Sequence, residues 1–216
     1  REECGLYDAD VWMLVGGTQT NATVIEALLR PFQGVLAVTS AHINVHEAGA
    51  IEAAGHKILT LPEHEGKMDA EELHSDLAEI YSDDSRMHMV VPGLVYITFP
   101  TEYGTIYSLA ELERIREVCN EFKLWLYLDG ARLGYGLAAE GCDVTLKDIA
   151  RICDVFYIGG TKEGLIFGEA IVAHKGVFEN FFTVAKRHGA IVAKGRMLGV
   201  QFETRFSDGL YMRVSH

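Results

Sequence analysis

Seven short apolar runs, rich in Val, Ile, Leu and Tyr, constrain the fold of this 216-residue chain more than any other feature. Each run has the length of a β-strand and lacks polar alternation, which is typical of strands buried on both faces. The runs are residues 11–15, 35–38, 57–61, 94–99, 124–128, 155–158 and 170–173.

Amphipathic stretches with helix start signals lie between many of these runs. Residues 185–206 also have a helical pattern, followed by a break at 207–209. The predicted capped helices are 70–81, with the capping-box pair Asp69 and Glu72; 109–122, with the pair Ser108 and Glu111; and 22–29, with Asn21 as the cap.

Strands that alternate with helices predict an α/β fold with a mainly parallel seven-stranded sheet covered by helices on both faces. In such sheets the ligand lies outside the carboxyl ends of the strands. Glycine-rich and polar clusters follow five of the predicted strands, so we expect them to face one pocket. These clusters are residues 16–21, 40–47, 100–104, 129–132 and 159–162.

The charge of the chain indicates the kind of partner it binds. With 19 basic and 31 acidic residues, the net charge of -12 disfavours nucleic acid and anionic membranes, which attract positive surfaces. A small molecule is therefore the expected partner. No apolar run approaches the ~18 residues of a membrane span, and the first residues lack a signal pattern, so the expected compartment is the cytoplasm.

Neither cysteine chemistry nor a metal site is indicated. The cysteines show no CxxC spacing and are predicted to be reduced structural thiols. His42 and His46 are four residues apart, but no cluster with ligand spacing accompanies them, so we predict no metal. The cysteines are Cys4, Cys119, Cys142 and Cys153.

Gly16, Gly17 and Thr18 follow an apolar run and open a predicted helix. Backbone N–H groups at such a helix start, together with the Thr18 hydroxyl, are suited to bind a phosphate. The segment matches neither the P-loop nor the GxGxxG motif. An ordinary glycine turn is the alternative interpretation.

Asp129 and Lys162 each follow an apolar run and are expected at the same sheet edge. A lysine amine that forms a Schiff base and a carboxylate that keeps a pyridine nitrogen protonated are the groups that pyridoxal phosphate chemistry needs. A buried ion pair and a surface lysine are the alternative. Arg132 suits an oxygen anion or a local ion pair with Asp129, and Thr161 suits the phosphate.

His42 stands just after a predicted strand, where its ring is placed to lie over an aromatic cofactor or to exchange protons with a substrate. A hydrogen-bonded histidine at a helix start is the alternative.

Taken together, these motifs resemble the threonine aldolase and β-eliminating lyase family of pyridoxal phosphate enzymes, over roughly residues 7–196. Residues 16–21 resemble the family's SGTQAN segment, and 128–132 resemble its VDGAR segment. His42, followed by Glu47, Ala48 and Gly49, resembles its AHxxxxEAG segment.

The resemblance implies that Lys162 forms the Schiff base with pyridoxal 5'-phosphate and that Asp129 contacts the pyridine nitrogen. It also implies that His42 stacks on the ring and that Arg132 reaches the ring oxygen or the substrate carboxylate. The implied phosphate contacts come from Gly16, Gly17, Thr18 and Thr161.

The family implies a type I aminotransferase fold, with active sites shared across a homodimer or homotetramer. We therefore expect residues 1–206 to form the cofactor domain, without the family's N-terminal arm, and 207–216 to begin a truncated C-terminal domain. Glu102 stands where threonine aldolases commonly have a histidine near the substrate hydroxyl. A carboxylate there is a candidate base for the β-hydroxyl proton.

The leading functional prediction is a lyase that cleaves a β-hydroxy amino acid such as threonine to glycine and an aldehyde. Glu102, His42 or a water molecule is the candidate base. One alternative keeps the cofactor and changes the reaction to β-elimination from an aromatic or sulfur amino acid, or to transamination. A second alternative is a non-catalytic partner subunit.

Overall fold

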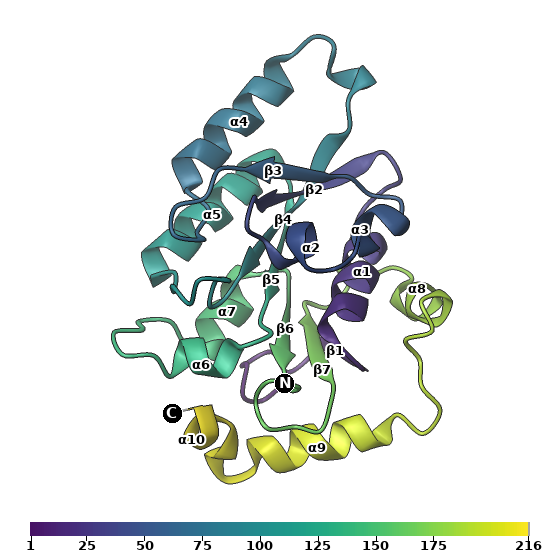
Figure 1. Cartoon of the computed structure of the whole chain (residues 1–216), viewed down its shortest axis with the longest axis vertical. Coiled ribbons are helices and arrows are strands. Elements are labelled where there is room, and N and C mark those ends of the chain that lie inside the picture. The colour runs from purple at the N-terminus through teal and green to yellow at the C-terminus, as the bar shows by residue number, and fades with distance from the viewer. Residues whose placement is uncertain (216) are drawn as a thin grey trace.

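The predicted strands all form, and they join in one seven-stranded sheet with the order β1-β7-β6-β5-β4-β2-β3 (Figure 1). This computed structural model describes residues 1–215. The strands are β1 (Asp10–Leu14), β2 (Gln33–Val38), β3 (Ile58–Leu61), β4 (Val91–Thr98), β5 (Trp125–Asp129), β6 (Val155–Gly159) and β7 (Glu169–Ala173).

The sheet is mainly parallel, as predicted, and β7 is the reversed strand. It pairs antiparallel with both β1 and β6, whereas β6, β5, β4, β2 and β3 pair in parallel. The reversal places Glu169, the first residue of β7, in register with Gly159, the last residue of β6. A carboxyl group thus starts β7 at the edge where the other strands end.

Helices cover both faces of the sheet (Figure 1). One layer contains α1 (Gly17–Leu28), α3 (Ala50–Ala53) and α8 (Phe181–Arg187), with both short helices packed on α1. In the other layer α5 (Leu109–Phe122) packs between α4 (Ala70–Ser82) and α7 (Leu146–Ile152). The remaining helices are α2 (His42–Val45), α6 (Leu133–Leu137), α9 (Arg196–Phe206) and α10 (Leu210–Ser215), with 3-10 turns η1 (Arg86–His88) and η2 (Ser207–Gly209).

Two predicted capping boxes behave differently. At α5, Ser108 and Glu111 form the complete reciprocal box. At α4, Asp69 accepts hydrogen bonds from the first turn, but the Glu72 side chain contacts Nε2 of His64 at 3.0 Å instead of returning to the cap. The box prediction is therefore wrong for Glu72, because a tertiary partner takes its carboxylate.

The prediction that Asn21 caps a helix over 22–29 is wrong. Helix α1 begins at Gly17, with Gly16 as its cap residue, so Asn21 lies inside the helix. Its side chain is fully buried and hydrogen-bonded to residues far along the chain. These tertiary partners, rather than the helix start, account for a buried polar residue here.

The single helix predicted over 185–206 is also wrong, because the chain forms α8 and α9 with a loop between them. Gly189 follows the end of α8 with φ 66°, a left-handed conformation that glycine adopts readily and that stops a helix. The predicted break after residue 206 is η2, where Asp208 has φ 55°. His216, in the predicted 207–216 segment, lies outside the described residues.

The centre of the sheet is buried on both faces. Every residue of β6 and β7 is buried, and so is every residue of β4 and β5 except the first. Within residues 1–215, no helix combines the length and the apolar character needed to cross a membrane.

Candidate active site

A cavity of about 330 Å³ opens at the carboxyl edge of the sheet. This volume falls in the range of small-ligand pockets. All five predicted polar clusters contribute to its wall, and the reversed strand adds Glu169. Among the predicted site residues, only Arg132 does not line it. Those that do are Gly16, Gly17, Thr18, His42, Glu102, Asp129, Thr161 and Lys162.

The glycine segment brings the N-terminus of α1 to the cavity. No side chain caps this helix, so its first N–H groups are available to an anion, which the positive end of the helix dipole also favours. Gly17 faces the Tyr157 hydroxyl closely, since an added Cβ would lie 3.3 Å from it. A phosphate site at this position therefore suits the geometry.

Lys162 lies in a loop that is tied to the start of β7. The backbone N–H of Gly160 donates to Oε2 of Glu169 at 2.9 Å, and that of Gly168 donates to Oγ1 of Thr161 at 3.1 Å. Burial raises the pKa of Glu169 to about 7. Lys162 itself is exposed, so its amine can meet a ligand.

Asp129 ends β5 and is almost completely buried. Its Oδ1 accepts hydrogen bonds from the Ala131 N–H at 2.9 Å and the Tyr157 hydroxyl at 2.5 Å. Its Oδ2 accepts from Asn21 Nδ2 at 3.0 Å and the Tyr96 hydroxyl at 2.5 Å. Four donors therefore fix the orientation of this carboxyl group.

The tyrosines around Asp129 were not identified from the sequence. Tyr96, Tyr127 and Tyr157 each stand two residues before the end of their strand, in β4, β5 and β6. The register places Tyr96 opposite Tyr127, and the ring of Tyr157 lies 6.4 Å from that of Tyr127, so the three form a group across neighbouring strands. Burial, followed by the charge of Asp129, raises the pKa of all three well above its ordinary value, so they act as neutral donors.

His42 is held by Glu47, another residue without a predicted individual role. Nδ1 of His42 lies 2.8 Å from Oε1 of Glu47. This hydrogen bond is the largest cause of the raised pKa of His42. The ring of His46 is 5.5 Å from that of His42, and within residues 1–215 no cluster of three or more acidic, histidine or cysteine side chains is placed to hold a metal.

Glu102 and Arg132 approach each other beside the cavity. Nη1 of Arg132 lies 3.9 Å from Oε2 of Glu102, while the predicted alternative of an Arg132 pair with Asp129 is not formed within the described residues. The Arg132 side chain is 40% exposed and that of Glu102 is 16% exposed. At 3.9 Å and with an exposed arginine, this ion pair is weak, so Arg132 remains available to an anion.

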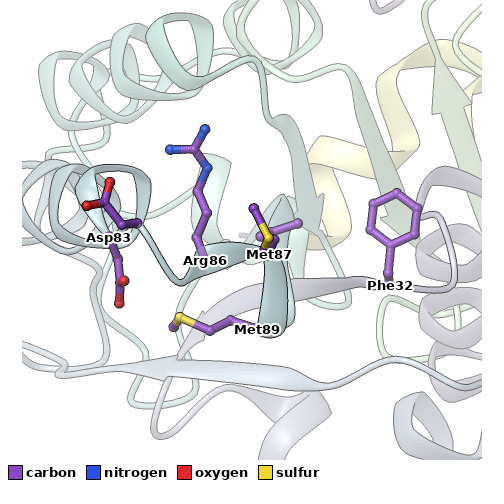
Figure 2. Close-up of a pocket in the computed structure, with 7 residues that line it drawn as sticks. Phe32, Asp83, Arg86, Met87 and Met89 are labelled. Carbon is purple, nitrogen blue, oxygen red and sulfur yellow. The ribbon is translucent and has the colours of Figure 1, made fainter.

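A second cavity, of about 500 Å³, lies at the amino ends of the parallel strands, opposite the first cavity (Figure 2). It is near the starts of β2 and β4 and is lined by Phe32, Asp83, Asp84, Arg86, Met87, Met89 and Val91. Figure 2 shows methionine and aromatic side chains around it. Its lining includes neither lysine nor histidine, so the Schiff-base group is found only at the first of these two cavities.

Comparison with known proteins gives a consistent result. The sequence profile of the beta-eliminating lyase family matches residues 4–201. Low specificity L-threonine aldolases from a Pseudomonas species and from Pseudomonas aeruginosa are both 31% identical to the chain, over 209 and 211 residues. These alignments cover 95% and 96% of the chain but 59% and 60% of the relatives. The chain thus spans about 60% of their length.

Solved structures agree with the sequence matches. A threonine aldolase structure from Leishmania major is 45% identical, with a TM-score of 0.94, and the match covers 99% of the chain and 62% of that protein. An aspartate aminotransferase from Thermus thermophilus has a TM-score of 0.68 at 17% identity, over 94% of the chain and 50% of that protein, which shows a shared fold.

Proposed function

The chain belongs to the beta-eliminating lyase family, and we propose that it forms the cofactor-binding part of a pyridoxal phosphate-dependent lyase. The proposed reaction cleaves a β-hydroxy amino acid such as threonine to glycine and an aldehyde. The observation that carries this proposal is the meeting of Lys162, Asp129 and His42 in one cavity that also contains a free helix N-terminus. The threonine aldolase relatives support the choice of substrate class.

The residues around the cavity fit this cofactor. Lys162 provides an exposed amine for the cofactor's aldehyde, and the start of α1 provides N–H donors for its phosphate. Asp129 is a buried carboxylate, suited to hold a proton on the ring nitrogen. When bound, the cofactor supplies the electron sink for the bond that breaks at the substrate Cα.

The protein's own groups then position the substrate and move its proton. Arg132 is placed beside the cavity to bind the substrate carboxylate or the ring oxygen. Glu102 lines the same cavity and is a candidate acceptor for the β-hydroxyl proton, as are His42 and a water molecule. The four hydrogen bonds that Asp129 accepts orient its carboxyl group for contact with the ring nitrogen.

A second candidate keeps the site and changes the products. Glu102 in place of a histidine favours β-elimination from an aromatic or sulfur amino acid, or transamination. Product analysis separates these reactions. Glycine with an aldehyde indicates aldol cleavage, pyruvate with ammonia indicates elimination, and an exchanged keto acid indicates transamination.

We also propose that the active protein is a cytoplasmic homodimer or homotetramer with shared active sites. The cavity wall contains the carboxylates Glu47, Glu102, Asp129 and Glu169 but only Lys162 as a permanent cation. A bound phosphate dianion adds further negative charge to this cavity. Additional positive side chains would offset that charge, and a second copy of the chain would supply them. Light scattering with and without cofactor tests the assembly, and a monomer of full activity would contradict it.

The experiment that tests the proposed function is a visible spectrum of the protein with pyridoxal phosphate, followed by borohydride reduction and peptide mass analysis. We expect absorbance that is lost on reduction, with the label on Lys162. Lys162→Ala should abolish both signals, whereas Lys175→Ala, two residues beyond the far end of β7, should retain them. A label on another lysine would refute the assignment, and a protein that binds no cofactor would favour the non-catalytic subunit.

A further inference from the structure

Glu47 lies between the two groups proposed to contact the cofactor ring, His42 and Asp129. Its side chain is fully buried, with an exposed fraction of 0%. One oxygen, Oε1, meets both Nδ1 of His42 at 2.8 Å and Nδ2 of Asn21 at 2.7 Å. The other oxygen, Oε2, has no hydrogen-bond partner among the described residues.

Asn21 ties Glu47 to Asp129. Its Nδ2 donates to Oε1 of Glu47 and, at 3.0 Å, to Oδ2 of Asp129. Its Oδ1 accepts from the Tyr127 hydroxyl at 2.7 Å. Because carboxylates only accept hydrogen bonds when ionised, the amide nitrogen must face them, and this fixes the orientation of Asn21. Two buried carboxylates therefore share one amide group.

Buried carboxyl groups are stabilised by a positively charged neighbour. Nδ1 of His42 is the only ring nitrogen of a histidine that meets either carboxylate among the described residues. The charged or titratable groups that face His42 are Glu47 in the turn after α2, Glu102 after β4 and Asp129 at the end of β5. His46 lies beside it on the same turn, and Lys162 lines the same cavity.

The three carboxylates all raise the pKa of His42. The hydrogen bond from His42 to Glu47 raises the pKa of the imidazole, and burial opposes this effect, with the net result a raised pKa. The charges of Glu47, Glu102 and Asp129 add to the rise. Glu47 dominates because it is in direct contact and is completely shielded from water.

We propose that Glu47 is a positioning residue that keeps His42 protonated and fixes its Nδ1–H toward the protein, while Asn21 ties this pair to Asp129. His42 then presents its Nε2–H to the cavity as a donor. A protonated imidazole cannot accept a proton, so the base of the proposed lyase reaction is Glu102 or a water molecule. This last step rests on the proposed function, whereas the charge state of His42 does not.

The test is an NMR titration of the histidines in the cofactor-free protein, with His42 identified by loss of its signals in His42→Gln. In the wild type we expect a midpoint above the ordinary value of about 6.5 and a protonated Nδ1. Glu47→Gln keeps the size of the side chain and an acceptor oxygen but removes the charge. The His42 midpoint should then fall by at least about one pH unit.

Matched variants separate this effect from a general change in the protein. Glu72→Gln removes the carboxylate that lies 3.0 Å from His64, outside the cavity, so it should leave the midpoint of His42 unchanged. Glu102→Gln should shift His42 by less than Glu47→Gln does, because Glu102 contributes charge without a direct hydrogen bond.

A His42 midpoint that is unchanged in Glu47→Gln would overturn the proposal. If that variant does not fold, a wild-type midpoint at or below about 6.5 would overturn it equally. A protein that binds no pyridoxal phosphate but shows the expected titration would refute the proposed function and leave this inference intact. A protein that binds pyridoxal phosphate but lacks the expected titration of His42 would refute this inference alone.

Discussion

The hydroxyl of Tyr157 donates a hydrogen bond of 2.5 Å to Oδ1 of Asp129, across the boundary between strands β6 and β5. Both side chains are buried, so water cannot replace this bond when it is lost. The tyrosine therefore contributes both to stability and to the orientation of the Asp129 carboxyl group.

Tyr157→Phe should lower the free energy of unfolding by about 1–3 kcal/mol, because it leaves a buried acceptor with one donor fewer. It should also weaken pyridoxal phosphate binding, since Asp129 loses one of the donors that orient its carboxyl group. Urea unfolding and cofactor titration measure the two effects. Tyr81→Phe is the control, because Tyr81 packs on Phe122 away from the cavity and should change neither quantity. Equal stability of the two variants would show that the hydroxyl of Tyr157 is not needed.

Glu169 should make the stability of the protein fall as the pH rises. Burial raises its pKa from 4.5 to about 7 in the folded state, so the folded chain holds a proton that the unfolded chain loses. Below about pH 4.5 the titration of Glu169 does not change the free energy of unfolding. Well above pH 7 it lowers this free energy by about 3 kcal/mol. Glu169→Gln, which resembles the protonated form, should therefore be more stable than the wild type at pH 8 and similar to it at pH 4.5.

Urea unfolding at these two pH values tests the effect of Glu169. Glu65→Gln, at an exposed loop residue, is the control, and its stability should match that of the wild type at both pH values. A Glu169→Gln variant that is less stable than the wild type at pH 8 would mean that the charged form is the one the fold requires.

The strands and the location of the site were predictable, because apolar runs identify buried strands and parallel strands end at one edge. This reasoning correctly placed Lys162 and Asp129 in the same cavity. It failed at Asn21, which a local rule assigned to a helix cap. Its actual partners, Glu47 and Asp129, are 26 and 108 residues away, and such contacts follow from packing rather than from local sequence.

The row of tyrosines illustrates the same limit. Each residue is an ordinary strand residue in its own segment, and only the register of β4 against β5 brings Tyr96 opposite Tyr127. The split between α8 and α9 was missed for another reason. Apolar residues continue through the segment, but Gly189 takes a left-handed conformation that ends the first helix.

Gly160→Ala should disturb the Lys162 loop. An added Cβ would lie 2.5 Å from the carbonyl oxygen of Gly168 and 2.9 Å from Cδ2 of Leu165, so the backbone must move. We expect a loss of about 1–3 kcal/mol in the free energy of unfolding and slower borohydride labelling of Lys162. Gly199→Ala is the matched control, because nothing lies within 4 Å of its Cβ and alanine favours a helix. A Gly160→Ala variant as stable as this control would contradict the close contact.

The role of Glu102 is the most direct test of the chemistry. If Glu102 accepts the β-hydroxyl proton, Glu102→Gln should lower kcat for threonine cleavage by about 10²–10⁴-fold with a smaller change in KM, since general base catalysis acts on the transition state. Arg132→Ala should instead raise KM, because it removes a cation beside the cavity that is suited to the substrate carboxylate. Aldehyde release measures both constants.

Glu102→His completes this comparison, because it restores a titratable base at the same position. We expect it to recover part of the kcat that Glu102→Gln loses, with a pH profile that follows the imidazole rather than the carboxyl group. Unchanged kcat in Glu102→Gln would assign the proton to a water molecule, on the proposal that Glu47 keeps His42 protonated.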